Sequence, residues 1–175
     1  WVLNSGAQAM GYQWQWDRVP EYLFFYEDGE WWSAELIDGL IVTLKISAIS
    51  LFFTLVFGLV TALLRLSDSK VGNAIGTAYV ELIRNTPLLV QIYLLYFVFG
   101  PVIGLDRFST AVLALSLFQG AYTAEIFRAG LNSIPRGQFE AAKTLGLSPV
   151  YTYQDVILPQ VLQRTLPPLT NEMVS

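Results

Sequence analysis

ISAISLFFTLVFGLVTALL, residues 46–64, runs for nineteen residues without a charged side chain. At about 1.5 Å of rise per residue, a helix of this length crosses a hydrocarbon layer of roughly 30 Å. Two further uncharged runs follow, TPLLVQIYLLYFVFGPVIGL at 86–105 and FSTAVLALSLFQGAYTA at 108–124, and another apolar segment begins near Leu166. Such runs could also be buried core helices, but three within 80 residues would need a soluble exterior that the sequence lacks. The sequence therefore predicts an all-α, polytopic transmembrane helical bundle.

The predicted membrane domain covers 36–175. Its spans are expected at about 40–65, 76–100 and 108–128, with the start of a fourth at about 160–175. We expect the sequence to be a piece of a longer protein at both ends, so that this number of spans is a minimum.

Composition narrows the functional class. Hydrophobic residues make up 54% of the chain and charged residues 14%, and there is no Cys or His. Thiol nucleophiles, imidazole bases and the common zinc and haem ligand sets are therefore excluded, and we expect no metal site and no catalytic residues. Most enzyme classes therefore lose their usual catalytic groups.

Residues 1–35 are rich in Trp, Tyr and Phe interleaved with acids. Across 1–38, seven carboxylates stand against one arginine, a local net charge of −6, which argues against nucleic acid as a partner. Aromatic rings of this kind favour the headgroup level of a bilayer, so an interfacial segment is predicted. Docking of a substrate-carrying protein is the alternative.

Lys and Arg predict the orientation. Arg65 and Lys70 follow the first span, whereas Arg128, Arg136, Lys143 and Arg164 lie between the third span and the incipient fourth. Both loops should face the cytoplasm, and the acidic N-terminal segment should face outward.

Two acid–arginine pairs lie at the edges of the spans. Glu81 and Arg84 are three residues apart, as are Glu125 and Arg128, so each pair shares one helical face and can form a boundary ion pair. Mutual pairing at the interface and a role along a solute path are both open. Pro87, just after the first pair, should kink or start the second span.

The polar segment at 134–159 is expected in the cytoplasm and contains EAAKTLGLSPVYTYQDVILPQ, residues 140–160. Helix formers from Gln138 to Leu145 lead to Gly146, a natural left-handed residue after a helix. Ser148 and Pro149 should begin a second short helix, which Pro159 should end or kink.

Glu140-Ala141-Ala142, three residues, Gly146, nine residues and VILP at 156–159 together resemble the EAA signature, E-A-A-x3-G-x9-I-x-L-P, of inner-membrane permease subunits of ATP-binding-cassette importers. Val156 stands where the signature has Ile. GAYTAEIFRAGLNSIPRGQFEAAKTLG at 120–146, ELIRNTP at 81–87 and LPPLTNEM at 166–173 are similar to the subfamily that imports polar amino acids of the histidine, glutamate, glutamine, arginine and opine type. The resemblance covers about 36–175.

The resemblance implies a subunit of about five spans, in the bacterial inner membrane, paired as a homodimer or with a sister permease. It also implies a cytoplasmic ATPase subunit, which carries ATP and Mg, and a periplasmic amino-acid-binding protein that delivers the solute. No cofactor is implied for this chain, which has no G-x4-G-K-[ST] motif. Carried onto this sequence, the contact with the ATPase is made by Glu140, Ala141, Ala142 and Gly146, with Leu145 and Arg136 nearby.

Thr170, Asn171, Glu172 and Met173 are the candidates for lining the solute path, because Pro167 and Pro168 could break the fourth span beside them. Hydrogen bonding between helices would explain the same polar residues. Three alternatives for function stay open: a permease for another small polar solute, a channel or scaffold without ATPase coupling, and a membrane-embedded enzyme. The last lacks an intramembrane aspartate pair.

Overall fold

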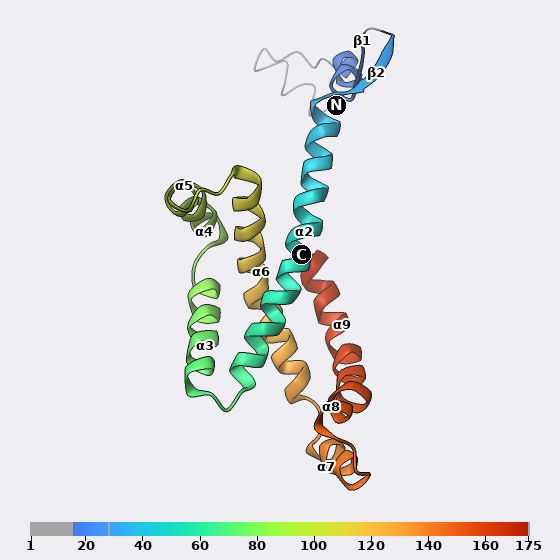
Figure 1. The fold of residues 1–175 in the computed structure, drawn as a ribbon. Coiled ribbons are helices and arrows are strands. Elements are labelled where there is room, and N and C mark those ends of the chain that lie inside the picture. Colours follow the sequence, from blue (N-terminus) through green and yellow to red (C-terminus); the bar gives the residue numbers. More distant parts are fainter. Residues whose placement is uncertain (1–15, 28, 175) are drawn as a thin grey trace, which may run out of the picture. The chain divides into compact units, whose positions relative to one another are not determined.

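The computed structural model describes residues 16–27 and 29–174 (Figure 1). The chain divides into two compact units, 1–46 and 47–175. In the first unit, a 3-10 helix η1 (Trp16–Tyr22) leads to an antiparallel hairpin of β1 (Phe24–Glu27) and β2 (Glu30–Ser33), in which Phe24 faces Ser33. Gly29 has φ 87°, a conformation that glycine adopts without the Cβ penalty. The hairpin lies within the expected interfacial segment and was not predicted; residues 1–15 of that segment lie outside the described residues.

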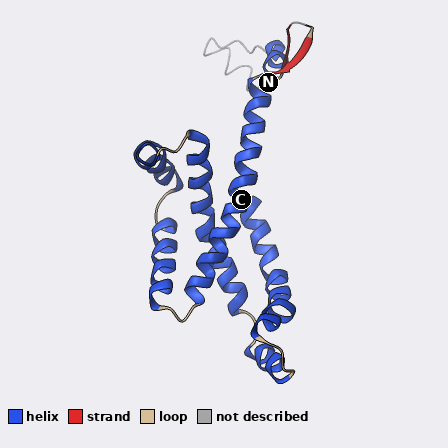
Figure 2. Ribbon diagram, viewed as in Figure 1, coloured by secondary structure: helices blue, strands red, loops and turns tan. Residues whose placement is uncertain are grey.

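Two of the described helices are long and apolar enough to cross a membrane. These are α2 (Glu35–Leu66), with a mean hydropathy of 2.3 over its most apolar window, and α6 (Arg107–Asn132), with 1.2. A third crossing exists if the bent pair Lys70–Arg84 and Leu88–Ile103 counts as one span. Apart from the hairpin, the described secondary structure is helical (Figure 2), and the all-helical class is confirmed.

The stretch predicted as the second span is bent by 106°. The helix α3 (Lys70–Arg84) is capped at its N-terminus by Ser69, whose hydroxyl accepts the Gly72 N–H, and it ends before Pro87. Pro87 then precedes α4 (Leu88–Leu94), which continues through a π-helical turn η2 (Leu95–Phe99) into α5 (Gly100–Ile103). At the corner, the Gln91 amide donates to the Ile83 carbonyl at 2.8 Å. As expected, Pro87 starts a helix, because it has no N–H to donate and cannot continue α3.

The helix α6 packs against residues 47–66 of α2 through small side chains. A Cβ at Gly58 would lie 2.5 Å from Thr123 Cγ2, and one at Gly120 would lie 3.0 Å from Phe57 Cβ. The Ser116 hydroxyl donates to the Val112 carbonyl at 2.6 Å and also bonds across to the Ser50 carbonyl at 3.3 Å. Small residues let two membrane helices approach closely enough for such contacts.

A second face of α6 contacts α3. Val80 is buried with Ala121 and Ala124, and the Tyr79 hydroxyl donates to the Leu117 carbonyl at 2.6 Å. α6 also packs on α9 (Leu158–Val174), so α6 is the helix around which the second unit is assembled.

Between α6 and α9 the chain forms α7 (Arg136–Thr144), a short helix α8 (Pro149–Tyr151) and a π-helical turn η3 (Thr152–Ile157). Gly146 has φ 72°, and the Ser148 hydroxyl accepts the Tyr151 N–H at 3.4 Å, both as expected.

Of the two roles expected of Pro159, ending its helix is wrong. The Leu158 N–H bonds back to Tyr153 in a wide π turn, and the helix continues through Pro159 into α9. Pro167 and Pro168 also lie inside α9 and do not end it.

Candidate functional site

The signature segment forms a compact knob beside the base of α9. Ile134, Ile157 and Val161 form a buried cluster, against which Leu131, Phe139 and Val156 pack. The Phe139 ring meets the Tyr153 ring edge to face at 5.9 Å, which orients α7 against η3. The Gln160 amide also donates to Gln138 at 3.3 Å. These contacts hold α7 against η3 and the start of α9.

The residues expected to contact an ATPase divide between the surface and the interior. Arg136, Glu140, Ala141 and Gly146 are exposed, and Leu145 has 79% of its surface accessible. Ala142 is only 2% exposed, so its side chain packs inside the chain and offers no surface to a partner. The small side chain of Ala142 thus allows close packing within the chain. The small side chain of Ala141 leaves room for a partner to approach the outer face of α7 closely.

One carboxylate joins two arginines at the ends of α2 and α6. Glu125 pairs with Arg128 on its own helix at 2.7 Å and with Arg65 at the end of α2. The three side chains are 16–35% exposed. Sequence reasoning identified Glu125 and Arg128 but missed Arg65, because nothing in the spacing shows that residues 60 positions apart will meet.

The other acid–arginine pair does not form. Within 16–27 and 29–174, Glu81 and Arg84 make no ion pair; the Arg84 guanidinium instead lies over the Tyr122 ring, 5.2 Å from its centroid. This cation–π contact fixes the end of α3 against the middle of α6.

A polar chamber of about 700 Å³ lies between α2, α6 and the end of α9. It is lined by Ser47, Ser50, Leu51, Thr54, Leu88, Leu115, Phe118, Gln119, Tyr122 and Glu172. The Gln119 amide donates to the Glu172 carboxylate at 3.2 Å and to its backbone carbonyl at 3.3 Å. Hydroxyl, amide and carboxylate groups in one chamber suit a small polar solute.

Among the candidates at 170–173 whose side chains the structure describes, only Glu172 lines the chamber. The Thr170 hydroxyl donates to the Leu166 carbonyl at 2.8 Å, Asn171 is exposed elsewhere, and the side chain of Met173 lies outside the described residues. Sequence reasoning missed Gln119 and the hydroxyls at 47, 50 and 54. Their spacing places these hydroxyls on one helical face, which was the available signal.

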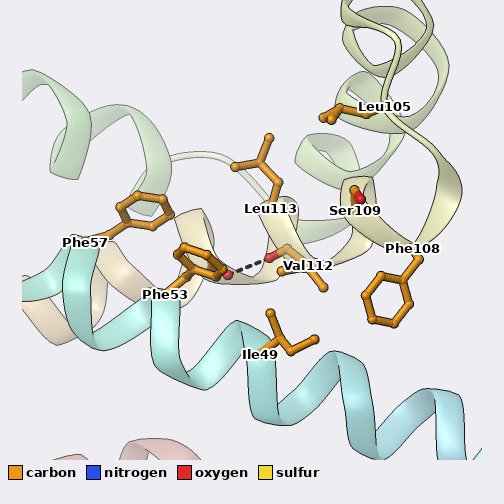
Figure 3. Close-up of a pocket in the computed structure, with 9 residues that line it drawn as sticks. Ile49, Phe53, Phe57, Leu105, Phe108, Ser109, Val112 and Leu113 are labelled. Atoms are coloured by element: carbon orange, nitrogen blue, oxygen red, sulfur yellow. Dashed lines mark hydrogen bonds between the residues drawn. The ribbon is translucent and has the colours of Figure 1, made fainter.

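A second cavity between α2 and α6 has the opposite character. Its volume is about 310 Å³. Figure 3 shows Phe53 and Phe57 of α2 on one side and Val112 and Leu113 of α6 on the other. The lining is otherwise Ile49, Leu105, Phe108 and two serines, Ser109 and Ser116. It contains no charged side chain and does not suit a charged solute.

Comparison with known proteins assigns the chain to a family. The L-cystine transport system permease protein TcyB of Bacillus subtilis is 36% identical over 98% of this chain and 70% of its own length. The arginine transport system permease protein ArtQ of Bacillus subtilis is 37% identical over 80% of this chain and 65% of its own. The solved structure described as "Crystal structure of an amino acid ABC transporter with histidines" superposes with a TM-score of 0.67 at 38% identity, covering 79% of this chain and 65% of that one.

The chain thus spans about two thirds of the length of these relatives. The family profile that matches residues 40–175 is described as "Binding-protein-dependent transport system inner membrane component". The match covers α2 from residue 40 onward, all later helices, the polar chamber and the signature segment. The chain therefore belongs to the family of binding-protein-dependent transport system inner membrane components.

Proposed function

We propose that this chain is the permease part of an ATP-driven importer of a polar amino acid. Its helices form one wall of the translocation path, and its EAA segment couples that wall to a cytoplasmic ATPase. The observation that carries the proposal is the polar chamber between α2, α6 and α9. The helix α9 connects this chamber to the EAA segment, because Glu172 of α9 lines the chamber and Val161 of α9 packs in the cluster that holds α7. The relatives that transport L-cystine and arginine support an amino acid as the solute.

Solute recognition in the chamber depends on Gln119 and Glu172. A carboxylate in a chamber between apolar helices favours a cationic group, which every amino acid carries at its α-ammonium. The hydroxyls of Ser47 and Thr54 add neutral donors and acceptors to the same space. Of the candidates 170–173, we therefore retain Glu172 as the residue of the solute path.

Coupling to the ATPase runs through the outer face of α7. Glu140, Ala141, Arg136 and Leu145 are exposed there and would meet the partner, with Gly146 setting the turn that follows. The remaining proposed partners are a second permease subunit, identical or related, and a binding protein that delivers the solute. With the basic segments at 65–70 and 128–164 in the cytoplasm, residues 1–35 would face the periplasm at the membrane interface.

Two glycines with the same backbone conformation give a matched test of coupling. Gly146 and Gly104 have φ values of 72° and 73°, and a Cβ would meet no atom within 4 Å at either. Tryptophan at each position therefore carries the same backbone penalty, on the order of 1–2 kcal/mol, but only Gly146 adjoins α7. In the complete transporter, Gly146→Trp should abolish co-purification of the ATPase and solute uptake, whereas Gly104→Trp should keep ATPase association.

Unchanged ATPase association and uptake in Gly146→Trp would refute the coupling assignment. If the wild-type transporter, reconstituted with its binding protein, took up no amino acid in the presence of ATP, the proposed function itself would be wrong. A channel or a scaffold would show no dependence of uptake on ATP.

A further inference from the structure

A basic groove lies next to the polar chamber, between α3, α6 and α9. Two connected hollows, of about 460 and 510 Å³, share Arg84 and Glu125 in their linings. The first also contains Arg65, Glu81 and Asn85, and the second contains Ser133, Arg164 and Pro168. We call the two together the basic groove.

The groove has an excess of positive charge. Four guanidinium groups, those of Arg65, Arg84, Arg128 and Arg164, lie in or beside it, against the carboxylates of Glu81 and Glu125. Glu125 already forms ion pairs with Arg65 and Arg128. Arg164 donates to the backbone carbonyl and to the hydroxyl of Ser133. In the described part of the chain, neither Arg84 nor Arg164 has a carboxylate within ion-pair distance.

The position of Arg84 along α3 indicates that its guanidinium binds an anion that arrives through the translocation path. Arg84 is at the far end of α3 from Lys70, and fifteen residues of helix are about 22 Å long. With Lys70 at the cytoplasmic boundary, that length reaches past the middle of a hydrocarbon core of roughly 30 Å. An unpaired charge at this depth is unfavourable by about 3 kcal/mol, so such residues tend to line a path or bind a ligand.

The groove and the chamber meet at one residue. Tyr122 lines the chamber on one side and the groove on the other, and its ring carries the Arg84 guanidinium. A solute leaving the chamber past Tyr122 therefore meets Arg84. A guanidinium is planar and presents paired donors that match the two oxygens of a carboxylate.

We propose that the basic groove binds the α-carboxylate of the transported amino acid on its way out of the chamber, with Arg84 as the residue that holds it. The inference rests on the proposed function. It adds that the α-carboxylate of the solute is recognised and that Arg84 recognises it. Glu172 and Arg84 would thus act on opposite ends of the solute, its ammonium and its carboxylate. The solute class is then α-amino acids with a free carboxylate, whatever their side chain.

The test measures binding of radiolabelled L-arginine or L-glutamine, whichever the complete transporter takes up, to the purified permease–ATPase complex without the binding protein. Competition by the amino acid is compared with competition by its carboxamide, which lacks the negative charge. A hydrogen bond to a charged group contributes about 1.5–3 kcal/mol, so the wild-type complex should prefer the carboxylate by about ten-fold or more. Arg84→Gln should remove this preference, and Arg84→Lys should restore part of it.

Arg107→Gln is the matched control, since Arg107 starts α6 and lines neither hollow of the groove. It should keep the wild-type preference. The readout is the ratio of the affinities for the amino acid and for its carboxamide. A variant with fewer active molecules therefore does not lose the preference for that reason alone. If Arg84→Gln does not assemble, loss of part of the preference in Arg84→Lys carries the same conclusion.

Two outcomes would overturn the proposal while leaving the proposed function intact. One is an Arg84→Gln complex that still prefers the carboxylate as the wild type does. The other is a wild-type preference for the carboxylate that is absent in nanodiscs containing the anionic lipid phosphatidylglycerol and appears only when that lipid is omitted, which would assign Arg84 to a lipid phosphate. A wild-type transporter that carries no amino acid would instead contradict the proposed function.

Discussion

Glu125→Gln should destabilise the permease more than the loss of an exposed surface charge would. The substitution leaves the shape of the side chain nearly unchanged but removes the negative charge that Arg65 and Arg128 share. Breaking a fully buried pair costs about 3–5 kcal/mol, whereas an exposed pair contributes about 0–1 kcal/mol. Side chains of Arg65 and Glu125 are 16% and 23% exposed, so we expect an intermediate loss of about 1–3 kcal/mol.

The assay is thermal unfolding of the complete permease in detergent, where a loss of 1 kcal/mol lowers the melting temperature by about 2–4 °C for a chain of this size. Glu81→Gln is the matched control, because Glu81 lines the same groove but forms no ion pair among the described residues. It should change stability by less than about 0.5 kcal/mol. Adding Arg65→Gln to Glu125→Gln should recover part of the loss, since an unpaired cation is then removed.

Equal losses in Glu81→Gln and Glu125→Gln would refute the reasoning, because the effect would then follow net charge and not the bridging geometry. A loss in Glu125→Gln that disappears at high salt would also contradict it, since partly buried pairs are screened weakly.

Three further substitutions test packing, capping and the orientation of the coupling helix. Gly58→Ala should destabilise by about 1–3 kcal/mol, because its Cβ would lie 2.5 Å from Thr123 Cγ2 and 2.8 Å from Thr123 Cβ. Thr123→Ala removes Cγ2 but keeps Cβ, so in a double-mutant cycle of thermal unfolding it should relieve only part of that loss. Asp106 caps α6, and its hydrogen bonds to Ser109 hold the pKa of that carboxyl below its usual range. The stability that this cap contributes should therefore be fully present above the unfolded pKa of about 3.9 and be lost as pH falls through the lower folded pKa. Melting curves at pH 3–6 should show this dependence for the wild type and lack it for Asp106→Ser. Phe139→Ala should lower the ratio of solute transported to ATP hydrolysed in proteoliposomes, because the aromatic ring against Tyr153 orients α7. Phe139→Tyr keeps the ring and should keep the ratio. An unchanged ratio in Phe139→Ala would show that this ring contact does not position α7.

Local sequence features predicted the helical elements where one physical requirement dominates. A charge-free run of nineteen residues has to bury its backbone in helix to enter lipid, so α2 follows from composition and length alone. Pro87, Gly146 and Ser148 act through their own backbone or through a neighbour three residues away, and each has the predicted role. Pro159 does not end its helix, because the wide turn of η3 just before it accommodates the missing N–H, and no sequence pattern marks a π turn in advance.

The sequence by itself determined the family and the helical class and located the EAA segment, because the EAA spacing and the apolar runs are properties of neighbouring positions. Only the tertiary structure decided which of those residues are at the surface: Ala142 is buried and Ala141 is exposed, although they are adjacent. Tertiary structure likewise brought Arg65 to Glu125, moved Arg84 from Glu81 to Tyr122, and placed Glu172 beside Gln119. The physical reason is that contacts between residues 38 to 60 positions apart depend on how closely the helices approach, which glycines such as Gly58 and Gly120 set and which one helix in isolation does not show.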